Sequence, residues 1–350
     1  MKKKSLIMKA VCIVAMFCWT SSKCICQITQ SLIMRGYASI TATYQNDTSN
    51  FGLGEQVLFF TSQISDRTTI LAESVFKFSP GSPTSYNVSI ERIILKSNIF
   101  GNHNLLIGKQ HTPVSYWNYT YHHGVVFSPT IDRPLFFAAE IIPLHTTGIG
   151  LQAANLTQYK IGYDFLVGNG IGASEVKDND KRKSITAAFR LHPIPTGIGK
   201  ELTLGMCYYN DVIARGAKMH DGSINHYKTN QQIGTASFSY FGSHFEGIAE
   251  GIAEYNHTDT MGTQKTTAGY LYAGIRFSDT SKLVPYLKAD YIHYEKGEIF
   301  HMDGSNVFSL IAGIRYEINY LSVLKLEFQH SNNDLTGAAN KVALQWSVGF

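Results

Sequence analysis

Residues 341–350 read KVALQWSVGF, and their side chains alternate between apolar and polar or small. The apolar side chains of this stretch are those of Val342, Leu344, Trp346, Val348 and Phe350. Successive side chains of a β-strand point to opposite faces, so these five would form one apolar row. A closed transmembrane β-barrel requires such a row, because one face of each strand meets lipid and the other meets the lumen.

The same alternation recurs along the chain from Ile33 onward, in runs of about the length that a tilted strand needs to cross a bilayer. We predict sixteen strands, at 33–45, 54–64, 67–79, 85–97, 103–113, 144–154, 156–168, 183–193, 199–210, 227–241, 243–256, 265–278, 281–294, 304–318, 320–330 and 338–350. The fold class is therefore all-β, a closed antiparallel transmembrane β-barrel. Closure follows because no water satisfies an open sheet edge inside hydrocarbon, and sixteen strands leave an aqueous lumen.

The links between the predicted strands mostly alternate in length. Short links such as 65–66 and 241–243 follow even-numbered strands, whereas long polar links such as 169–182, 211–226, 257–264 and 295–303 follow odd-numbered strands. Short periplasmic turns and longer external loops are typical of barrels and place both termini on the periplasmic side.

The N-terminal stretch has the features of a cleavable signal peptide. Lysines at positions 2, 3, 4 and 9 precede an apolar run at 10–19, which is too short to span a membrane as a helix. We predict a signal peptide at 1–26 and one barrel domain at 27–350. Removing 1–26 turns 30 basic against 26 acidic residues into 25 against 26, so nucleic-acid binding is not expected. Only Cys207 remains, which excludes an intrachain disulfide and a cysteine zinc site.

Residues 114–143 (VSYWNYTYHHGVVFSPTIDRPLFFAAEIIP) form the longest gap in the strand pattern. The segment is unusually aromatic and apolar for an external loop, which favours a loop folded into the lumen; the alternative is a loop packed over the rim or against a neighbouring subunit. In the first case its polar contacts with solute, at a constriction, would be Tyr121, His122, His123, Asp132 and Arg133.

Strand parity assigns many charged side chains to the lumen. The basic ones are Arg35, Lys77, Arg92, Lys109, Lys160, Arg190, Arg276, Lys288, Arg315 and Lys325. The acidic ones are Glu73, Asp164, Glu246, Glu250, Glu254, Asp290, Glu317 and Glu327. Because the two signs nearly balance, no ion preference is predicted. The spacing of Glu246, Glu250 and Glu254 also fits a helix face, but the glycines and alanines between them favour a strand.

No pattern of residues indicates an enzyme. G-x-S-x-G does not occur, and His330-Ser331-Asn332 lies at a predicted loop mouth, where solvated side chains are expected. Adjacent His122 and His123 cannot easily share one face, and no acidic third ligand stands at a fixed spacing, so neither a metal nor another cofactor is predicted.

Residues 103–151 resemble a stretch, G-[KR]-x-x-x-P followed by R and G-[IV]-x-L, of the general and phosphate-selective porins of Gram-negative outer membranes. The matching positions are Gly108, Lys109, Pro113, Arg133, Gly148, Ile149 and Leu151. The resemblance implies a homotrimeric outer-membrane protein that passes small hydrophilic solutes, with 114–143 as the infolded third external loop. It also implies that Phe350 is recognised by the barrel-assembly machinery. The alternative is a non-transporting barrel that acts as an adhesin or as a scaffold of a surface or export complex.

Overall fold

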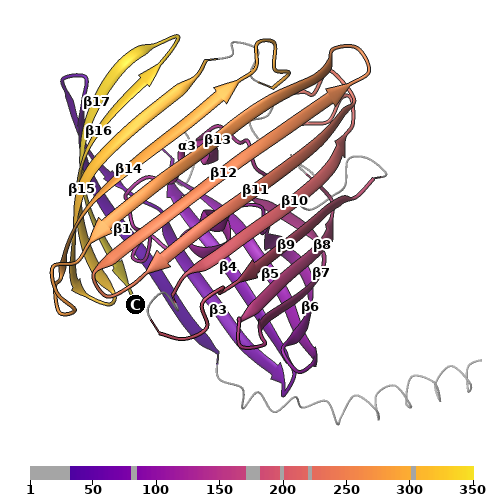
Figure 1. Ribbon diagram of the computed structural model, residues 1–350, viewed down its shortest axis with the longest axis horizontal. Helices are drawn as coiled ribbons and strands as arrows, with labels where there is room; N and C mark the ends of the chain where they lie inside the picture. The colour runs from indigo at the N-terminus through magenta and orange to yellow at the C-terminus, as the bar shows by residue number, and fades with distance from the viewer. Residues whose placement is uncertain (1–31, 80–84, 171–181, 198–200, 220–222, 301–304) are drawn as a thin grey trace, which may run out of the picture.

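The computed structural model describes residues 32–79, 85–170, 182–197, 201–219, 223–300 and 305–350. In these residues a single antiparallel sheet closes on itself to form a barrel with strongly tilted strands (Figure 1). Strands that follow one another in the sequence pair side by side, apart from β2 and β3, which both pair with β1, and the last strand pairs with the first. The predicted signal peptide, 1–26, lies outside the described residues.

The described residues contain seventeen strand segments and two short helices. The strands of the first half are β1 (Ile33–Gln45), β2 (Thr48–Leu53), β3 (Gln56–Ser65), β4 (Thr68–Phe78), β5 (Tyr86–Phe100), β6 (His103–His111), β7 (His145–Leu156) and β8 (Ile161–Gly168). The strands of the second half are β9 (Ser184–Leu191), β10 (Thr203–Ile213), β11 (Thr229–Phe241), β12 (Phe245–Thr258), β13 (Gly262–Ile275), β14 (Leu283–Tyr294), β15 (Val307–Asn319), β16 (Ser322–Asn333) and β17 (Gly337–Gly349). The helices are α2 (Tyr116–Thr120) and α3 (Leu135–Ala138).

The segments β2 and β3 are two halves of one transmembrane strand. Both pair with β1, and the register slips by one residue between them, at Gly54 and Glu55. Counted this way, the described part of the chain forms a barrel of sixteen strands, which confirms the prediction. The second strand begins at Thr48 rather than at 54, because Asn46 and Asp47, with φ of 51° and 59°, make a tight two-residue hairpin.

Alternating side chains divide the wall into an apolar outer face and an inner face that is mostly buried. On β17, Val342, Leu344 and Trp346 are 40%, 46% and 49% exposed, whereas Gln345 and Ser347 are buried. The apolar outer row matches a hydrocarbon environment, and the predicted faces of this strand are confirmed. No helix in the described residues is both long and apolar enough to cross a membrane.

The seam between β1 and β17 is fully paired. Tyr37 lies opposite Gly349, and the pairing continues to Gln45 opposite Lys341. Gly36 and Phe350 exchange two backbone hydrogen bonds of 2.9 and 3.0 Å. A side chain at position 36 would collide with the ring of Phe350, so the seam needs a glycine there.

Link lengths follow the predicted alternation only in part. The longest link in the described chain, 112–144, leaves β6 at the end of the barrel opposite Phe350, and links 66–67 and 320–321 at the Phe350 end are short. However, 259–261 and 334–336 are short although they follow the eleventh and fifteenth predicted strands (β12 and β16), and 192–202 is long although it follows the eighth (β9). The predicted long loop 257–264 is wrong, because β12 and β13 extend to Thr258 and Gly262.

Candidate functional site

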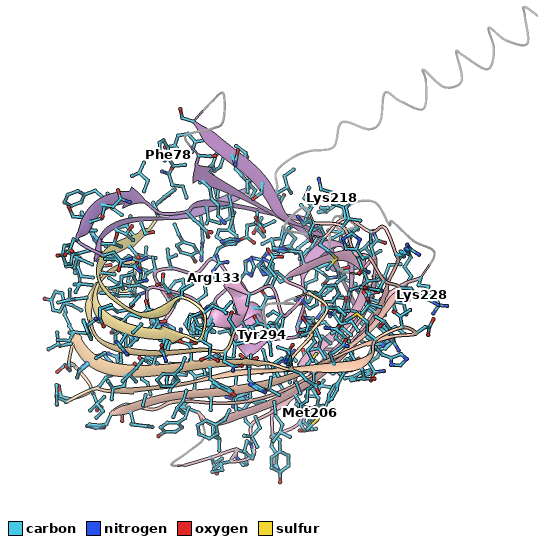
Figure 2. The ribbon with its side chains drawn as sticks, turned by 90° about the horizontal axis from the view of Figure 1, so that it is seen from above. Phe78, Arg133, Met206, Lys218, Lys228 and Tyr294 are labelled. Atoms are coloured by element: carbon cyan, nitrogen blue, oxygen red, sulfur yellow. The ribbon has the colours of Figure 1, made fainter. Side chains whose placement is uncertain are left out.

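Residues 114–143, here called the inner segment, run through the inside of the barrel between β6 and β7. The segment contains both helices, and Ser115 caps α2 by accepting a hydrogen bond from the backbone N–H of Asn118. Figure 2 shows Arg133 within the ring of strands, whereas Met206 of β10 points away from it. The segment therefore occupies the space where the sequence predicts the lumen.

Hydrogen bonds tie the inner segment to the wall formed by β12, β14, β16 and β17. The carboxylate of Glu250 accepts from the Ser115 hydroxyl at 3.1 Å and from the Tyr116 N–H at 2.7 Å. The ammonium of Lys325 donates to the Val125 carbonyl at 2.8 Å and to the Ser128 hydroxyl at 2.9 Å. Three further ties are the Ile131 N–H to Glu327 at 2.7 Å, the Leu135 N–H to Asp290 at 3.3 Å and the ion pair between Lys341 and Asp132.

The inner segment also buries apolar side chains against the same half of the barrel. Trp117, Phe136, Phe137, Ile141 and Ile142 are at most 6% exposed and join one apolar cluster. Their partners on the inner face of the wall include Tyr209, Ile233, Ile248, Ile252, Tyr270, Tyr272, Tyr286 and Ile311. A water-filled lumen would be lined mainly by polar side chains. Strand parity places Tyr270 and Tyr272 on the inner face, but it does not predict that they pack against apolar side chains of the inner segment rather than facing water.

The segment FEGIAEGIAEYN is a strand, β12, as the glycines and alanines indicated. Its first acid, Glu246, forms the centre of a charge network with Arg276 at 3.0 Å and Arg315 at 2.8 Å. Both arginines also bind Glu317, at 2.6 and 3.0 Å. The third acid, Glu254, accepts from the side chains of Gln231 and Asn256 at 2.7 and 2.9 Å. Glu246, Arg276, Arg315 and Glu317 thus neutralise one another and do not form a one-signed lining.

Other predicted lumen charges contact the inner segment. The ammonium of Lys288 lies 3.2 Å from Asp290 and 5.4 Å from the centre of the Trp117 ring. Arg190 pairs with Asp164, and its guanidinium stacks at 4.0 Å over the ring of Tyr119. Cation–π contacts of this kind fix a loop to a charged wall.

Two of the lysines that are predicted to line the lumen, Lys160 and Lys109, lie elsewhere. Lys160 does not line the wall: it lies exposed in the turn between β7 and β8, with φ of 46°. The prediction for Lys160 is wrong because β8 begins only at Ile161, so parity counted from 156 does not apply. Lys109 lies on the outer face, opposite Ile93, which is 44% exposed, and it donates to the backbone carbonyl of Ile90 at 2.7 Å. Its prediction is wrong because Gln110, not Lys109, is the buried inward residue of this part of β6.

The predicted constriction residues divide into an aromatic and a charged group. The ring of Tyr121 lies 5.1 Å from that of Trp117, in the apolar cluster. Asp132 pairs with Lys341 of β17, and Arg133 donates to Glu55 at 2.8 Å. The inner segment thus contacts walls on both sides of the barrel.

Four imidazoles gather where the inner segment meets β5, β6 and β7. His111 is the last residue of β6, His145 is the first residue of β7, and the two are partners in the strand register. His122 and His123 come from the inner segment. Ring centres lie 3.8 Å apart for His111 and His122, and 4.8 Å apart for His122 and His145. Burial, and then the charges of the neighbouring imidazoles, hold the pKa of His122 well below its ordinary value.

The carboxylate of Glu91 stands among these imidazoles. Its Oε2 lies 2.8 Å from His145 Nε2, 3.6 Å from His123 Nε2 and 4.0 Å from His122 Nε2. Among the described residues, Glu91, His122 and His123 form one group of potential metal ligands, and His111, His122 and His145 form another. In each group the ligand atoms lie within 4.8 Å of one another.

Strand parity did not assign Glu91 to the lumen, because β5 bulges at this residue. Arg92 pairs with Glu73 and Ile90 with Ser74, which leaves Glu91 as the extra residue. A bulge redirects a side chain, so Glu91 and Arg92 both turn inward. Ile90 and Ile93 both face outward, at 52% and 44% exposure. The signal in the sequence is their spacing of three positions, which breaks the period of two.

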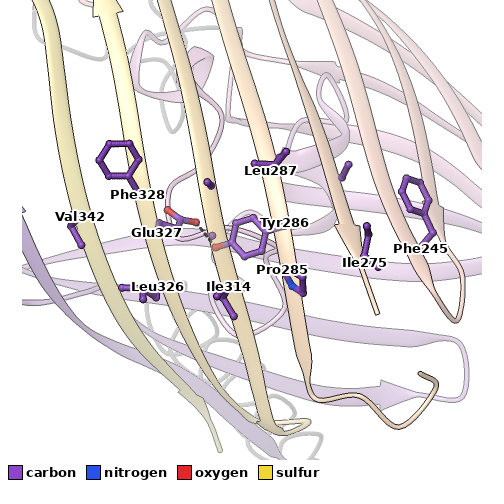
Figure 3. Close-up of a pocket in the computed structure, with 13 residues that line it drawn as sticks. Phe245, Ile275, Pro285, Tyr286, Leu287, Ile314, Leu326, Glu327, Phe328 and Val342 are labelled. Atoms are coloured by element: carbon purple, nitrogen blue, oxygen red, sulfur yellow. Dashed lines mark hydrogen bonds between the residues drawn. The ribbon is translucent and has the colours of Figure 1, made fainter. Parts of the chain in front are cut away.

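An apolar groove of about 630 Å³ lies on the barrel wall across β12 to β17 (Figure 3). Outward side chains such as Leu287 and Leu326, 57% and 49% exposed, line it together with Phe328 and Val342. The polar atoms of Tyr286 and Glu327 bind each other at 2.7 Å. The groove is therefore part of the apolar outer belt rather than a site for a polar solute.

No family model and no curated protein matches the chain, but its fold is similar to solved outer-membrane proteins. An anion-selective porin from Comamonas acidovorans superimposes with a TM-score of 0.66 at 12% identity, over 92% of this chain and 100% of that one. The trimer form of OmpT from Vibrio cholerae gives 0.63 at 10% identity, over 92% and 99%. OmpF of Salmonella typhi, in complex with daunomycin, gives 0.60 at 13% identity, over 91% and 97%.

This chain has the porin fold. The likeness covers nearly the whole of each chain, so it extends to the closed sixteen-stranded barrel and not only to a few hairpins. The resemblance noted for residues 103–151 is thus confirmed for the fold. With identities of 10% and 12%, the porin fold is maintained by alternation and closure rather than by particular side chains.

Proposed function

We propose that the protein is an outer-membrane porin of a Gram-negative bacterium, through which small hydrophilic solutes or ions diffuse without the help of a cofactor. The observation that carries this proposal is the inner segment, which crosses a closed barrel and contacts both walls. On one side it binds Glu250, and on the other Arg133 binds Glu55. A barrel narrowed by such a segment selects solutes by size and charge rather than by reaction.

The narrowed passage lies beside Arg133 in this proposal. The side chains of Arg133 and Asp132 are 27% and 48% exposed, whereas most charges of the opposite wall are buried in ion pairs. Lys77 pairs with the same carboxylate, Glu55, at 2.6 Å and remains 54% exposed. Exposed charges at the narrowest point set the ion preference of a pore, because permeating ions pass close to them.

Single-channel recording tests this proposal. The protein lacking residues 1–26, refolded in detergent and added to a planar bilayer, is expected to insert with discrete current steps. In asymmetric salt, Arg133→Gln should shift the reversal potential towards cations, since one positive charge leaves the passage. Arg67→Gln, in the turn between β3 and β4, is the matched control and should leave the potential unchanged.

The outcomes separate two parts of the proposal. Steps with an unchanged reversal potential in Arg133→Gln would mean that the inner segment does not line the ion path. Folded protein that gives no current at all would contradict the porin function itself.

Assembly as a homotrimer in outer-membrane lipid, with Phe350 recognised by the barrel-assembly machinery, belongs to the same proposal. OmpT of Vibrio cholerae is described in a trimer form. The apolar groove across β12 to β17 offers a surface on which a second copy or lipid can lie. Sedimentation in detergent, with the detergent mass subtracted, should give three chains per particle; a single chain would contradict the trimer.

A non-transporting barrel is the second candidate, and the apolar cluster favours it. Trp117, Phe136 and Phe137 fill one half of the interior as a soluble protein core does. Such packing would suit a plugged barrel that serves as an adhesin or as a scaffold of a surface or export complex. Electrical silence of a correctly folded protein supports this candidate over the porin.

A further inference from the structure

We propose that His122, His123 and Glu91 bind one divalent transition-metal ion of the class that imidazoles prefer, such as Zn²⁺, with His145 and His111 available to complete its coordination. The ion would connect the inner segment to β5, β6 and β7. This inference depends on the geometry of the cluster alone and does not require the barrel to conduct.

The tautomer of His122 follows from its partners. The side-chain N–H groups of Asn118 donate to the carbonyls of Thr112 and Leu144, both at 2.9 Å. The Oδ1 of Asn118 is therefore an acceptor, and His122 Nδ1, 2.5 Å away, must carry the proton. Consequently His122 Nε2 bears a lone pair, and it points towards Glu91.

His123 is oriented in the same way by a carboxylate. Its Nδ1 lies 2.5 Å from Glu55 Oε2 and 3.0 Å from the guanidinium of Arg133. In the neutral ring whose Nδ1 donates to Glu55, Nε2 carries the lone pair that a metal ion would use. The buried Nε2 of His123 has no hydrogen-bond partner in the described residues. A carboxylate or carbonyl that holds the second nitrogen of an imidazole is the usual outer support of a metal-binding histidine.

In these neutral tautomers, two lone pairs and a carboxylate oxygen face one another. The Oε2 of Glu91 lies 3.6 Å from His123 Nε2 and 4.0 Å from His122 Nε2, while its Oε1 accepts from the Ser89 hydroxyl at 2.5 Å. Three negative ends at these distances repel one another unless a cation stands between them. Tetrahedral Zn²⁺ with bonds of about 2.0–2.1 Å keeps its ligands about 3.3 Å apart, so a small contraction suffices.

Further imidazoles are available for a fourth ligand. His145 Nε2 lies 2.8 Å from the same Glu91 oxygen, and the Nε2 of His111, buried and without a hydrogen-bond partner, faces Glu73 at 3.7 Å. A ligand set of several imidazoles and one carboxylate suits Zn²⁺, Ni²⁺, Co²⁺ and Cu²⁺ and not Ca²⁺ or Mg²⁺, which prefer oxygen. The sequence predicts no metal at His122 and His123, because adjacent side chains cannot easily share one face and no acidic ligand stands at a fixed spacing from them. They follow α2 in a turn, where both rings can face Glu91.

Metal binding is tested on the folded protein that lacks residues 1–26, which removes four cysteines and leaves Cys207. After treatment with a chelator, a titration with Co²⁺ should give the visible absorption of a tetrahedral nitrogen–oxygen site at one ion per chain, and Zn²⁺ should displace it. Absence of any saturable binding of Co²⁺ or Zn²⁺ at micromolar concentrations would overturn the proposal.

The ligands are tested by His122→Gln, His123→Gln and Glu91→Gln. Each should weaken Zn²⁺ binding at least about tenfold, since loss of even an outer partner of a metal site costs this much. His330→Gln makes the same chemical change at an exposed histidine of β16 that binds Asn340, and it should bind Zn²⁺ as the wild type does. Equal affinities in all four variants would refute the assigned ligands.

A measurement on the wild type keeps the test decisive if a variant does not fold. The X-ray absorption spectrum of the Zn²⁺-loaded barrel should show the multiple scattering that is typical of two or more imidazoles. A spectrum with only water and carboxylate oxygens would refute the site. Conductance does not enter any of these readouts, so a silent channel and an absent metal site are distinguishable results.

Discussion

Gly108 is the residue on which the contact between β5 and β6 depends most. Its φ is 132°, and a Cβ built at this position would collide with the carbonyl oxygen of Ile93. Ile93 lies two residues beyond Glu91, so the close approach of the two backbones accompanies the bulge that turns Glu91 inward. The glycine therefore permits the wall geometry that supports the histidine cluster.

Gly108→Ala tests this role. The substitution should lower the free energy of unfolding by at least about 1–3 kcal/mol, the cost of holding an ordinary residue in a rarely populated backbone region. Gly251→Ala on β12, where a Cβ would meet nothing, is the control and should change stability by less than about 1 kcal/mol. Urea titrations followed by the electrophoretic shift between folded and unfolded barrel measure both. Similar losses in the two variants would argue against strain at position 108.

At the scale of elements, β12 and the inner segment are held together by a few directed bonds. Glu250 accepts from two donors of the segment, and Glu254, four residues further on the same strand, accepts from wall residues Gln231 and Asn256. The two acids thus have the same chemistry and strand but different partners. Substituting each acid in turn therefore distinguishes the attachment of the inner segment from the stability of the wall.

Glu250→Ala should loosen the inner segment without opening the barrel. Loss of the carboxylate leaves the Ser115 hydroxyl and the Tyr116 N–H without their acceptor, a cost of about 1–3 kcal/mol for a buried donor. Amide hydrogen exchange at Tyr116 is expected to accelerate in Glu250→Ala and to stay unchanged in Glu254→Ala. Faster exchange in both variants would show that the wall, not this contact, controls the segment.

The sequence was sufficient to predict the strands and to favour an infolded segment at 114–143, but insufficient to predict the contacts that this segment makes inside the barrel. Alternation at Val342, Leu344 and Trp346 is a local signal, and it located every strand except β2, where only Phe51 and Leu53 show it. The histidine cluster required long-range information, since Glu91 reaches it only through a bulge that breaks the period of two. The apolar side chains on the inner face of β9 to β15 are likewise explained only by the inner segment that covers them, and strand parity gives no information about such a partner.

At the scale of the whole molecule, the barrel has two tryptophans in opposite environments. Trp346 of β17 is 49% exposed on the outer face, and Trp117 of the inner segment is 1% exposed within the apolar cluster. The third, Trp19, lies in the predicted signal peptide. The two environments provide a direct test of which face meets lipid.

Lipids brominated on their acyl chains quench tryptophans that they can contact. In protein without residues 1–26, Trp117→Phe leaves Trp346 as the emitter, and its fluorescence should fall strongly in brominated vesicles. Trp346→Phe leaves Trp117, which should be quenched far less because the wall shields it. Equal quenching of the two variants would contradict the assignment of the outer face to lipid.

The seam between β1 and β17 has a consequence for the time that folding takes. It joins Tyr37 to Gly349, partners that are separated by nearly the whole described chain, whereas every other pair of strands is joined by a link within the chain. Loop-closure entropy grows only slowly with length, but contacts of such separation slow folding greatly. Hairpins can form early, yet β1 and β17 each keep an unpaired edge until they pair with each other. Anything that shields those edges meanwhile would speed up productive folding and suppress aggregation.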